Sequence, residues 1–407
     1  MSEWKRYKLG ELLRVKHGWA FKGEFFSDTG VQSILTPGNF YESGGFKANP
    51  SKDRFYSGDY PKEYLCSKGD LVVAMTEQAA GLLGSTAIVP EDNRYLHNQR
   101  IGLISCNESL NKDFAYYLFM TQSVRQQISR SASGTKVKHT SPEKIYDVQV
   151  DIPKIQTQKN IAIFLSILDK KIQINNQINQ ELEDMAKTLY DYWFVQFDFP
   201  DQNGKPYKSS GGKMVYNPEL KREIPEGWGV EKLGDITICH DSKRVPLSSN
   251  DRELVKGEIP YYGATGIMDY VNDYIFDGDY VLMAEDGSVM TEKGTPILQR
   301  ISGKNWVNNH AHVLEPIKNH SCKLLMMLLK DVSVMKIKTG SIQMKINQEN
   351  MNKIVVPAIP LELLFEINQK LEVIDKQQLN LIEENKQLTQ LRDWLLPMLM
   401  NGQVKVG

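Results

Sequence analysis

The chain has 407 residues, of which 41% are apolar and 24% are charged, with 49 Lys plus Arg against 50 Asp plus Glu. This length accommodates two globular domains, since one domain usually takes about 100 to 200 residues. The formal net charge of −1 excludes a uniformly basic surface, so a polyanionic partner would have to bind at local patches.

Membrane segments and disulfide frameworks are not expected. No apolar run approaches the roughly 18 residues that a membrane span requires, and the first residues do not resemble a signal peptide. We therefore expect a soluble, cytoplasmic protein with no membrane partner. The four cysteines stand far apart without a Cys-x-x-Cys pair, which favours buried thiols over a zinc knuckle. They are Cys66, Cys106, Cys239 and Cys322.

The two halves of the chain resemble each other. A tryptophan and a Leu-Gly-acidic motif open each half, a Gly-Asp turn precedes an apolar stretch, and an asparagine follows an aromatic residue further on. The matching pairs are Trp4 to Leu12 with Trp228 to Ile236, Gly69 to Ala74 with Gly278 to Met283, Asn98 with Asn309, and Ile152-Pro153 with Ile359-Pro360. Such a duplication predicts one common fold that carries two different recognition surfaces.

Heptad patterns predict a long helix at the end of each half. Apolar and amide residues recur at spacings of four and three over residues 161–189 and again over residues 367–395. We expect helices of about 33 residues, roughly 50 Å long. Pro153 and Pro360 precede these helices, and Pro397 is expected to end the second one.

These two helices are predicted to pack on each other in antiparallel fashion, because each one ends its half of a duplicated chain. The predicted contact residues are Leu165, Leu168, Ile172, Asn179, Leu182, Leu189, Leu371, Ile374, Gln378, Asn385, Leu388 and Leu395. Amide side chains at such positions fix the register of a coiled coil at a cost in stability. The alternative is that each helix packs only on its own domain as an ordinary amphipathic helix.

Motifs for nucleotide hydrolysis and methyl transfer are absent. The stretch 211–214 lacks the upstream glycine and the hydroxyl residue of a Walker A loop, and neither Asn49-Pro50 nor Asn217-Pro218 continues into an adenine methyltransferase tetrapeptide. Glu384-Asn385-Lys386 has the Glu-x-Lys form found in nucleases, but it lies within the heptad pattern and fits a solvated helix face better. We therefore predict a non-catalytic chain.

The histidines and cysteines do not predict a metal site. His310 and His312 stand two apart in an expected strand and could share one face, but hydrogen-bonded histidines are the better interpretation. Cys239, His240 and Asp241 are neighbours in sequence, and neighbours along a strand point apart, so we assign them no catalytic role. No metal and no cofactor are expected on this chain.

Basic residues gather just before each predicted helix. A single charge run usually marks a solvated surface, but recurrence at the same place in both halves favours contacts with phosphates and base edges. The candidate DNA-binding residues in these clusters are Arg130, Lys136 and Lys138 in the first half and Lys336, Lys338 and Lys345 in the second. Glycine-flanked polar loops elsewhere add Lys22, Arg54, Arg94 and Arg100 in the first half and Lys243, Arg244, Lys293 and Lys304 in the second.

The centre of the chain resembles a known family. The stretches 192–200, 204–208, 210–212, 224–228 and 232–235 together resemble the specificity subunit of bacterial type I restriction-modification systems, and the resemblance extends over nearly the whole chain. It implies an α+β fold in which two pseudo-repeated mixed α/β target-recognition domains are separated by two long antiparallel coiled-coil helices. The expected boundaries are 1–153 and 225–357 for the domains, 154–197 and 358–407 for the helices, and 198–224 for the linker.

This resemblance also implies a function. Each domain would read one half of an interrupted sequence in double-stranded DNA. Two methyltransferase subunits would bring S-adenosylmethionine, and restriction subunits would use ATP and magnesium. Two protein elements that enter the major groove from one side of the duplex lie about 34 to 36 Å apart, or a multiple of this distance. The expected helix length of roughly 50 Å is of the same order. The alternative is a coiled-coil scaffold that binds proteins and no DNA.

Overall fold

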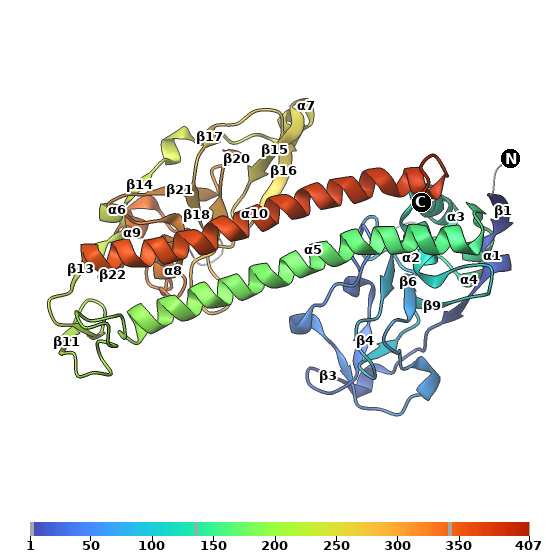
Figure 1. Ribbon diagram of the computed structural model, residues 1–407, viewed down its shortest axis with the longest axis horizontal. Helices are drawn as coiled ribbons and strands as arrows, with labels where there is room; N and C mark the ends of the chain where they lie inside the picture. The colour runs from blue at the N-terminus through green and yellow to red at the C-terminus, as the bar shows by residue number, and fades with distance from the viewer. Residues whose placement is uncertain (1–3, 135–136, 341–343, 407) are drawn as a thin grey trace. The chain divides into compact units, whose positions relative to one another are not determined.

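The computed structural model of the chain describes residues 4–134, 137–340 and 344–406 (Figure 1). It forms two compact units, the first comprising Met1–Ile174 and Glu384–Gly407 and the second comprising Asn175–Glu383. Two long helices, α5 (Ile155–Tyr190) and α10 (Leu361–Met400), contribute to both units.

Two four-stranded sheets form the domain of the first unit, in the orders β2-β9-β6-β7 and β3-β5-β4-β8. The strands are β2 (Leu13–His17), β9 (Ile101–Cys106), β6 (Leu71–Ala74), β7 (Thr86–Ile88), β3 (Phe26–Ser27), β5 (Phe55–Tyr56), β4 (Ser33–Leu35) and β8 (Tyr95–His97). A further pair joins β1 (Lys5–Lys8) to β10 (Gln149–Ile152) in antiparallel register. All four residues of β6 are buried, as expected of a central strand that is covered on both faces.

Four short helices belong to the first unit: α1 (Leu9–Leu12), α2 (Lys112–Met120), α3 (Gln122–Ser131) and α4 (Pro142–Tyr146). The side chain of Asn111 caps α2 by accepting from the backbone N–H of Phe114. Buried apolar side chains of α2, α3 and β6 form one core with the first turns of α5 and the last turns of α10. Within this core, Leu165 of α5 is 0% exposed and Leu399 of α10 is 1% exposed.

The second unit has a similar arrangement, with one sheet in equivalent order and the other different at its edge. Its two four-stranded sheets have the orders β14-β21-β18-β19 and β16-β15-β20-β17. The strands are β14 (Thr237–Cys239), β21 (Ala311–Pro316), β18 (Tyr280–Ala284), β19 (Leu298–Ile301), β16 (Ile267–Val271), β15 (Lys256–Tyr262), β20 (Lys304–Val307) and β17 (Phe276–Asp277). Antiparallel pairs join β13 (Gly229–Lys232) to β22 (Val355–Ala358) and β11 (Met214–Asn217) to β12 (Arg222–Pro225). The helices are α6 (Leu233–Ile236), α7 (Ser249–Leu254), α8 (Cys322–Leu329) and α9 (Gln348–Asn352).

The strand pairings confirm the predicted duplication but correct its register. Each unit has one parallel pair, β4 with β8 and β15 with β20. The carboxamide oxygen of Asn98 accepts from the N–H of Arg100, and that of Asn308 accepts from the N–H of His310, both at 2.8 Å. Asn98 therefore corresponds to Asn308 and not to Asn309. The one-residue slip arose because two asparagines stand side by side in the second half.

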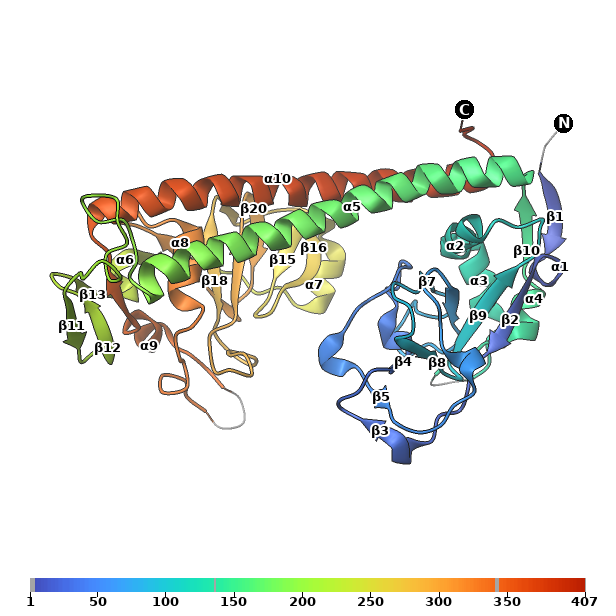
Figure 2. The same cartoon turned by 60° about the horizontal axis from the view of Figure 1, so that its bottom comes forward.

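The long helices pack together within each unit and run antiparallel, which confirms the predicted fold class (Figure 2). In the first unit, Arg392 of α10 donates to Asp169 of α5 at 3.0 Å. In the second, the side chain of Gln378 donates to the backbone oxygen of Asn179 at 3.1 Å. The helices also pack on their own domains, so the two predicted packing modes occur together.

A short polar network joins each domain to both long helices. In the first unit, the hydroxyl of Tyr117 on α2 donates to Asp169, the same carboxyl group that receives Arg392. In the second unit, Lys323 on α8 donates to Glu183 of α5 and to Gln378 of α10. All predicted helix-contact residues are buried or half-buried, from Leu165, Leu168, Ile172, Asn179, Leu182 and Leu189 on α5 to Leu371, Ile374, Gln378, Asn385, Leu388 and Leu395 on α10.

The prediction that Pro397 ends α10 was wrong, since this helix continues to Met400. A proline in the last turn removes only one backbone hydrogen bond, and its own carbonyl still accepts from the N–H of Asn401 at 3.1 Å. The other long helix, α5, is followed by a π-helical turn over Asp191–Val195.

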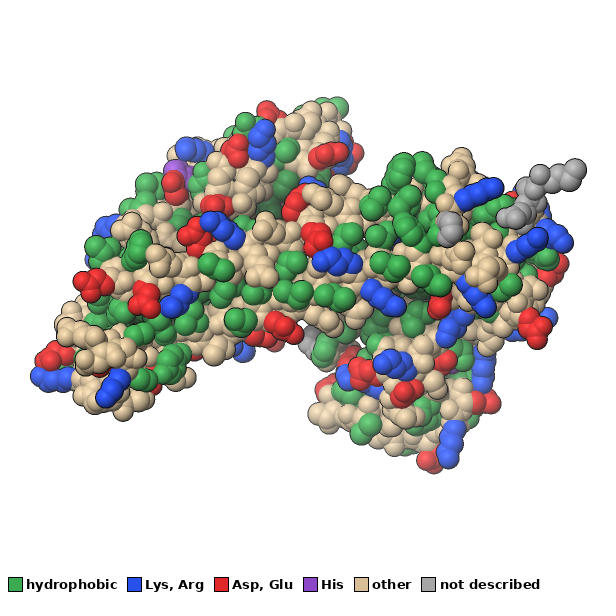
Figure 3. Space-filling view, in the orientation of Figure 1, with side chains coloured by type: hydrophobic (Ala, Val, Ile, Leu, Met, Phe, Trp, Pro, Cys, Tyr) green, Lys and Arg blue, Asp and Glu red, His purple; other side chains and the backbone are tan. Residues whose placement is uncertain are grey.

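Apolar side chains remain exposed along α5. Ile163, Ile167 and Ile174 in the first unit are 58%, 56% and 49% exposed, and Met185 and Tyr192 in the second are 59% and 37% exposed. Figure 3 shows hydrophobic side chains along the course of this helix. In the second unit, Met185 and Tyr192 line an open groove of about 650 Å³. These positions fall on one stripe of a 3.6-residue helix, opposite to the face that packs inward.

The prediction that the four cysteines are buried thiols holds for two of them. Cys66 and Cys322 are buried free thiols as predicted, whereas Cys106 and Cys239 are only half-buried.

None of the helices in the described part of the chain combines the length and the apolarity needed to cross a bilayer.

Candidate nucleic-acid interface

A closed loop follows α3 in the first unit. The backbones of Ser133 and His139 pair through two hydrogen bonds of 2.9 and 2.8 Å. Gly134 begins the turn with φ +101°, and a Cβ there would lie 2.2 Å from the oxygen of Val137, so only glycine fits. We call the described residues 133–134 and 137–139 the first closed loop; the predicted contact Lys136 lies outside the described residues.

This loop lies beside the segment that follows the central strand β6. Glu77 N–H donates to the oxygen of Lys138, and Thr140 N–H donates to that of Met75, both at 2.9 Å. On the other side of this segment, Met75 N–H donates to Arg100 at 2.9 Å. The structure thus brings Lys138 and Arg100 to one end of the central sheet.

The second unit has a closed loop at the same place. Thr339 and Lys345 pair through two backbone hydrogen bonds of 2.7 and 2.8 Å, and Gly340 has φ +79°. Ile346 N–H donates to the oxygen of Glu285 at 2.8 Å, and Glu285 N–H donates to that of His310 at 2.9 Å. The described residues 339–340 and 344–345, which we call the second closed loop, therefore lie beside the segment that follows β18, as the first closed loop lies beside the segment that follows β6.

The other predicted contacts of the first unit divide into two groups. Arg130 is exposed in the last turn of α3, beside Ser129, whose hydroxyl receives the ammonium of Lys138 at 3.3 Å. Lys22, Arg54 and Arg94 lie elsewhere. Lys22 is exposed before a 3-10 turn over Gly23–Phe25. Arg54 pairs with Asp28 at 2.9 Å, and Arg94 pairs with Glu91 at 3.2 Å and with Asp53 at 3.5 Å.

The second unit shows a similar division. Lys336 is exposed before the second closed loop, the ammonium of Lys338 contacts the sulfur of Met344 at 3.2 Å, and Lys345 pairs with Glu285 at 3.0 Å. Lys243 and Lys293 are exposed on a 3-10 turn and on the loop before β19, and Lys304 lies over the ring of Tyr274.

Arg244 requires a correction, because its guanidinium faces the interior. Its side chain is 11% exposed, and it pairs with Glu285 at 2.6 Å and with Asp241 at 3.2 Å. It also donates to the backbone oxygen of Ala311 at 2.8 Å. With these partners the side chain stabilises the domain, and we no longer place it among the DNA contacts.

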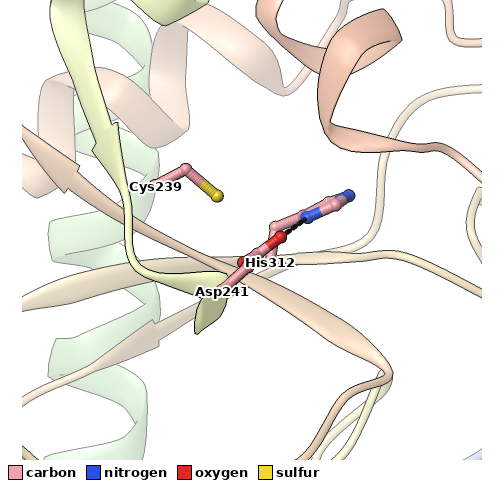
Figure 4. Close-up of side chains that lie close together, drawn as sticks. All are labelled: Cys239, Asp241 and His312. Carbon is pink, nitrogen blue, oxygen red and sulfur yellow. Dashed lines mark hydrogen bonds and ion pairs between the residues drawn. The ribbon is translucent and has the colours of Figure 1, made fainter. Parts of the chain in front are cut away.

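Cys239, Asp241 and His312 lie close together beneath the second closed loop (Figure 4). Nδ1 of His312 is 2.5 Å from a carboxyl oxygen of Asp241. Two ligands of one tetrahedral ion lie more than about 3 Å apart, so this contact is a hydrogen bond. Arg244 already supplies a cation there. Burial acts to raise the pKa of Asp241, but the hydrogen bonds and charges of its neighbours, chiefly His312 with Cys239 and Arg244, together outweigh burial and lower the pKa.

His310 and His312 do not share one strand face, contrary to the expected geometry. β21 begins only at Ala311, so His310 lies in the preceding turn, where it pairs with Asp286 at 2.5 Å. Sequence reasoning missed the joint role of Asp241, Glu285 and His312. The signal was a buried histidine in an apolar strand, since a buried polar ring needs partners from other parts of the chain.

Comparisons with known proteins agree with this architecture. The family model described as "Type I restriction modification DNA specificity domain" matches residues 1–184 and 225–390. The chain is 24% identical over 330 residues to the MjaIX specificity subunit of Methanocaldococcus jannaschii, covering 76% of this chain and 73% of that one. It is 23% identical over 477 residues to the HindI specificity subunit of Haemophilus influenzae, covering 99% and 100%.

One solved structure shares the fold. The type I restriction-modification S subunit from M. genitalium superposes with a TM-score of 0.57 at 18% identity, covering 98% of this chain and 96% of that one. The family model matches well over half of the residues, in both halves of the chain. The chain therefore belongs to the family of type I restriction-modification DNA specificity subunits, the non-catalytic subunits that give such a system its DNA sequence specificity.

Proposed function

We propose that this specificity subunit reads an interrupted DNA sequence, with one half-site for the domain at 1–153 and one for the domain at 225–357. The two closed loops carry the proposal, because each lies at the same end of an equivalent sheet. Both loops depend on a glycine with positive φ, Gly134 or Gly340. Two equivalent but chemically different surfaces suit two different half-sites.

Cations next to these loops, together with further cations elsewhere on each domain, would provide the DNA contacts. Lysine ammonium groups suit phosphate oxygens, whereas arginine can form two hydrogen bonds with one guanine. The retained candidates are Lys22, Arg54, Arg94, Arg100, Arg130, Lys136, Lys138, Lys243, Lys293, Lys304, Lys336, Lys338 and Lys345. The near-neutral chain is consistent with partner subunits that neutralise part of the duplex charge.

As a specificity subunit, the chain works in a complex with other subunits. We place two methyltransferase subunits on the exposed apolar stripe of α5 and on the outer side of α10, where Leu361, Phe365 and Val373 are also exposed. Exposed apolar stripes of this length are typical of protein interfaces. S-adenosylmethionine, ATP and magnesium would then be bound by methyltransferase and restriction subunits. The helices at 154–197 and 358–407 and the linker at 198–224 would join and space the domains.

Methylation mapping of host DNA with and without the chain tests this function. An interrupted methylated motif should be present with the chain and disappear when only this chain is removed. A scaffold that binds proteins alone would leave every methylated motif in place and would retain no specific DNA together with its partners. Either result would contradict the proposal.

A further inference from the structure

A buried ion network lies at the base of the second closed loop. We propose that this network positions the second closed loop for base reading, which makes Glu285 and His312 positioning residues for one half-site only. The inference rests on the proposed function and goes beyond it, because neither side chain is among the predicted DNA contacts.

Glu285 is the centre of this network. It directly follows β18 and is 8% exposed. One carboxyl oxygen pairs with Arg244 at 2.6 Å, and the other pairs with Lys345 of the loop at 3.0 Å. Burial acts to raise the pKa of Glu285, but the hydrogen bonds from these two cations outweigh it and lower the pKa. Removing a buried carboxylate of this kind leaves uncompensated cations behind.

His312 connects the exit of the loop to a second carboxylate. Its ring is 1% exposed, and Nε2 lies 2.8 Å from the backbone oxygen of Ile346, an acceptor only, so Nε2 carries a proton. Nδ1 lies 2.5 Å from Asp241. Two lone pairs do not face each other at this distance, so another proton lies between these two atoms. The ring therefore forms a charge-assisted link from Asp241 to the loop.

The network ties the loop to three other segments of the second unit. Asp241 and Arg244 belong to the 3-10 turn after β14, Glu285 follows β18, and His312 belongs to β21. Asp241 also accepts from the backbone N–H of Val313 at 3.1 Å. Asp241, Arg244, Glu285 and His312 each have at least two partners, so Lys345 and the exit of the loop are held in one place relative to the central sheet.

The first closed loop lacks such a network among the described residues. Met75 occupies the position of Glu285 in the first unit. Gly102 occupies the position of His312, because Gly102 pairs with Val73 in the same way that His312 pairs with Met283. The side-chain hydrogen bond at this base joins Thr76 to Nδ1 of His139 at 3.0 Å. This hydrogen bond and a 3.9 Å ion pair between Lys138 and Glu77 thus stand where the second unit has five charged or protonated groups.

The test uses the assembled methyltransferase complex with Glu285→Gln, which keeps the size of the side chain and removes its charge. Methylation is measured on the mapped target and on DNAs in which one half-site at a time carries a substitution. We expect discrimination at one half-site to fall about tenfold and that at the other to change less than about twofold, since a well-placed base contact contributes on the order of tenfold or more. His139→Gln is the matched variant, and it should affect only the other half-site.

Hydrogen exchange of the same complex checks that the loop itself has moved. The amides of Lys345 and Ile346 should exchange faster in Glu285→Gln, while those of His139 and Thr140 should not change. Asp241→Asn provides a second variant with the same expected pattern. Loss of discrimination at both half-sites, or at neither, would overturn the inference. If the unmodified complex showed no dependence on either half-site, the proposed function would fail instead.

Discussion

The two units share a frame and differ in their polar interior. Each has one sheet with the same strand order, an equivalent parallel strand pair and a closed loop opened by glycine. The other sheet differs at its edge, because β3 lies beside β5 in the first unit whereas β17 lies beside β20 in the second. The first unit buries His97, whose Nε2 lies 3.0 Å from the oxygen of Lys16 and whose Nδ1 has no partner among the described residues. The second buries His312 in an ion network. Apolar burial therefore defines the common fold, and different polar residues build different loops upon it.

The largest predicted difference between the units concerns acid stability. Burial lowers the pKa of His97 to about 4. An unfolded histidine has a pKa near 6.5, so between these values the unfolded chain binds a proton that the folded chain does not. The free energy of unfolding of the first unit should therefore decrease as pH falls through this window, by up to about 1.4 kcal/mol per pH unit. Hydrogen exchange of β6 and β9 between pH 7 and 5 measures it.

His97→Val provides the matched variant, because Val307 occupies the equivalent position at the end of β20. This variant should lose the stability of the hydrogen bond to Lys16 and also most of the pH dependence. A first unit whose stability stays flat from pH 7 to 5, or a variant with an unchanged slope, would show that the ring of His97 is not held neutral.

A smaller effect is expected from single lysines of the two loop surfaces. Lys138→Ala and Lys336→Ala each remove one proposed phosphate contact, so each should weaken DNA binding equally for all sequences. The slope of log affinity against log salt concentration should decrease by about 1 for each variant. Titrations of the assembled complex at several salt concentrations measure this. If either variant changed discrimination at a single base pair instead, that lysine would be a base contact.

Regular and repeated features were predictable from the sequence. The heptad spacing predicted α5 and α10, because a periodic apolar pattern allows few other structures. The duplicated motifs predicted two equivalent domains. Asn98 was matched one residue out of register because local similarity cannot distinguish Asn308 from Asn309, whereas backbone pairing can.

Tertiary partners of charged residues were not predictable. Arg244 looked like an exposed cation in a polar stretch, but Asp241, three residues earlier, and Glu285, far along the chain, enclose it. A sequence pattern reports charge and spacing, and it does not report which carboxylates the fold will bring nearby. For the same reason, Lys138 and Lys336 could be proposed as contacts but not ranked.

The central claim is that two equivalent domains read separate half-sites and that the paired helices set the distance between these half-sites. Removing one heptad from each helix keeps the phase of their packing and shortens each by about 10.5 Å, or about three base pairs of DNA. Methylation mapping with this shortened chain should show the same two half-site sequences separated by a spacer about three base pairs shorter. An unchanged spacer between intact half-sites would contradict the account.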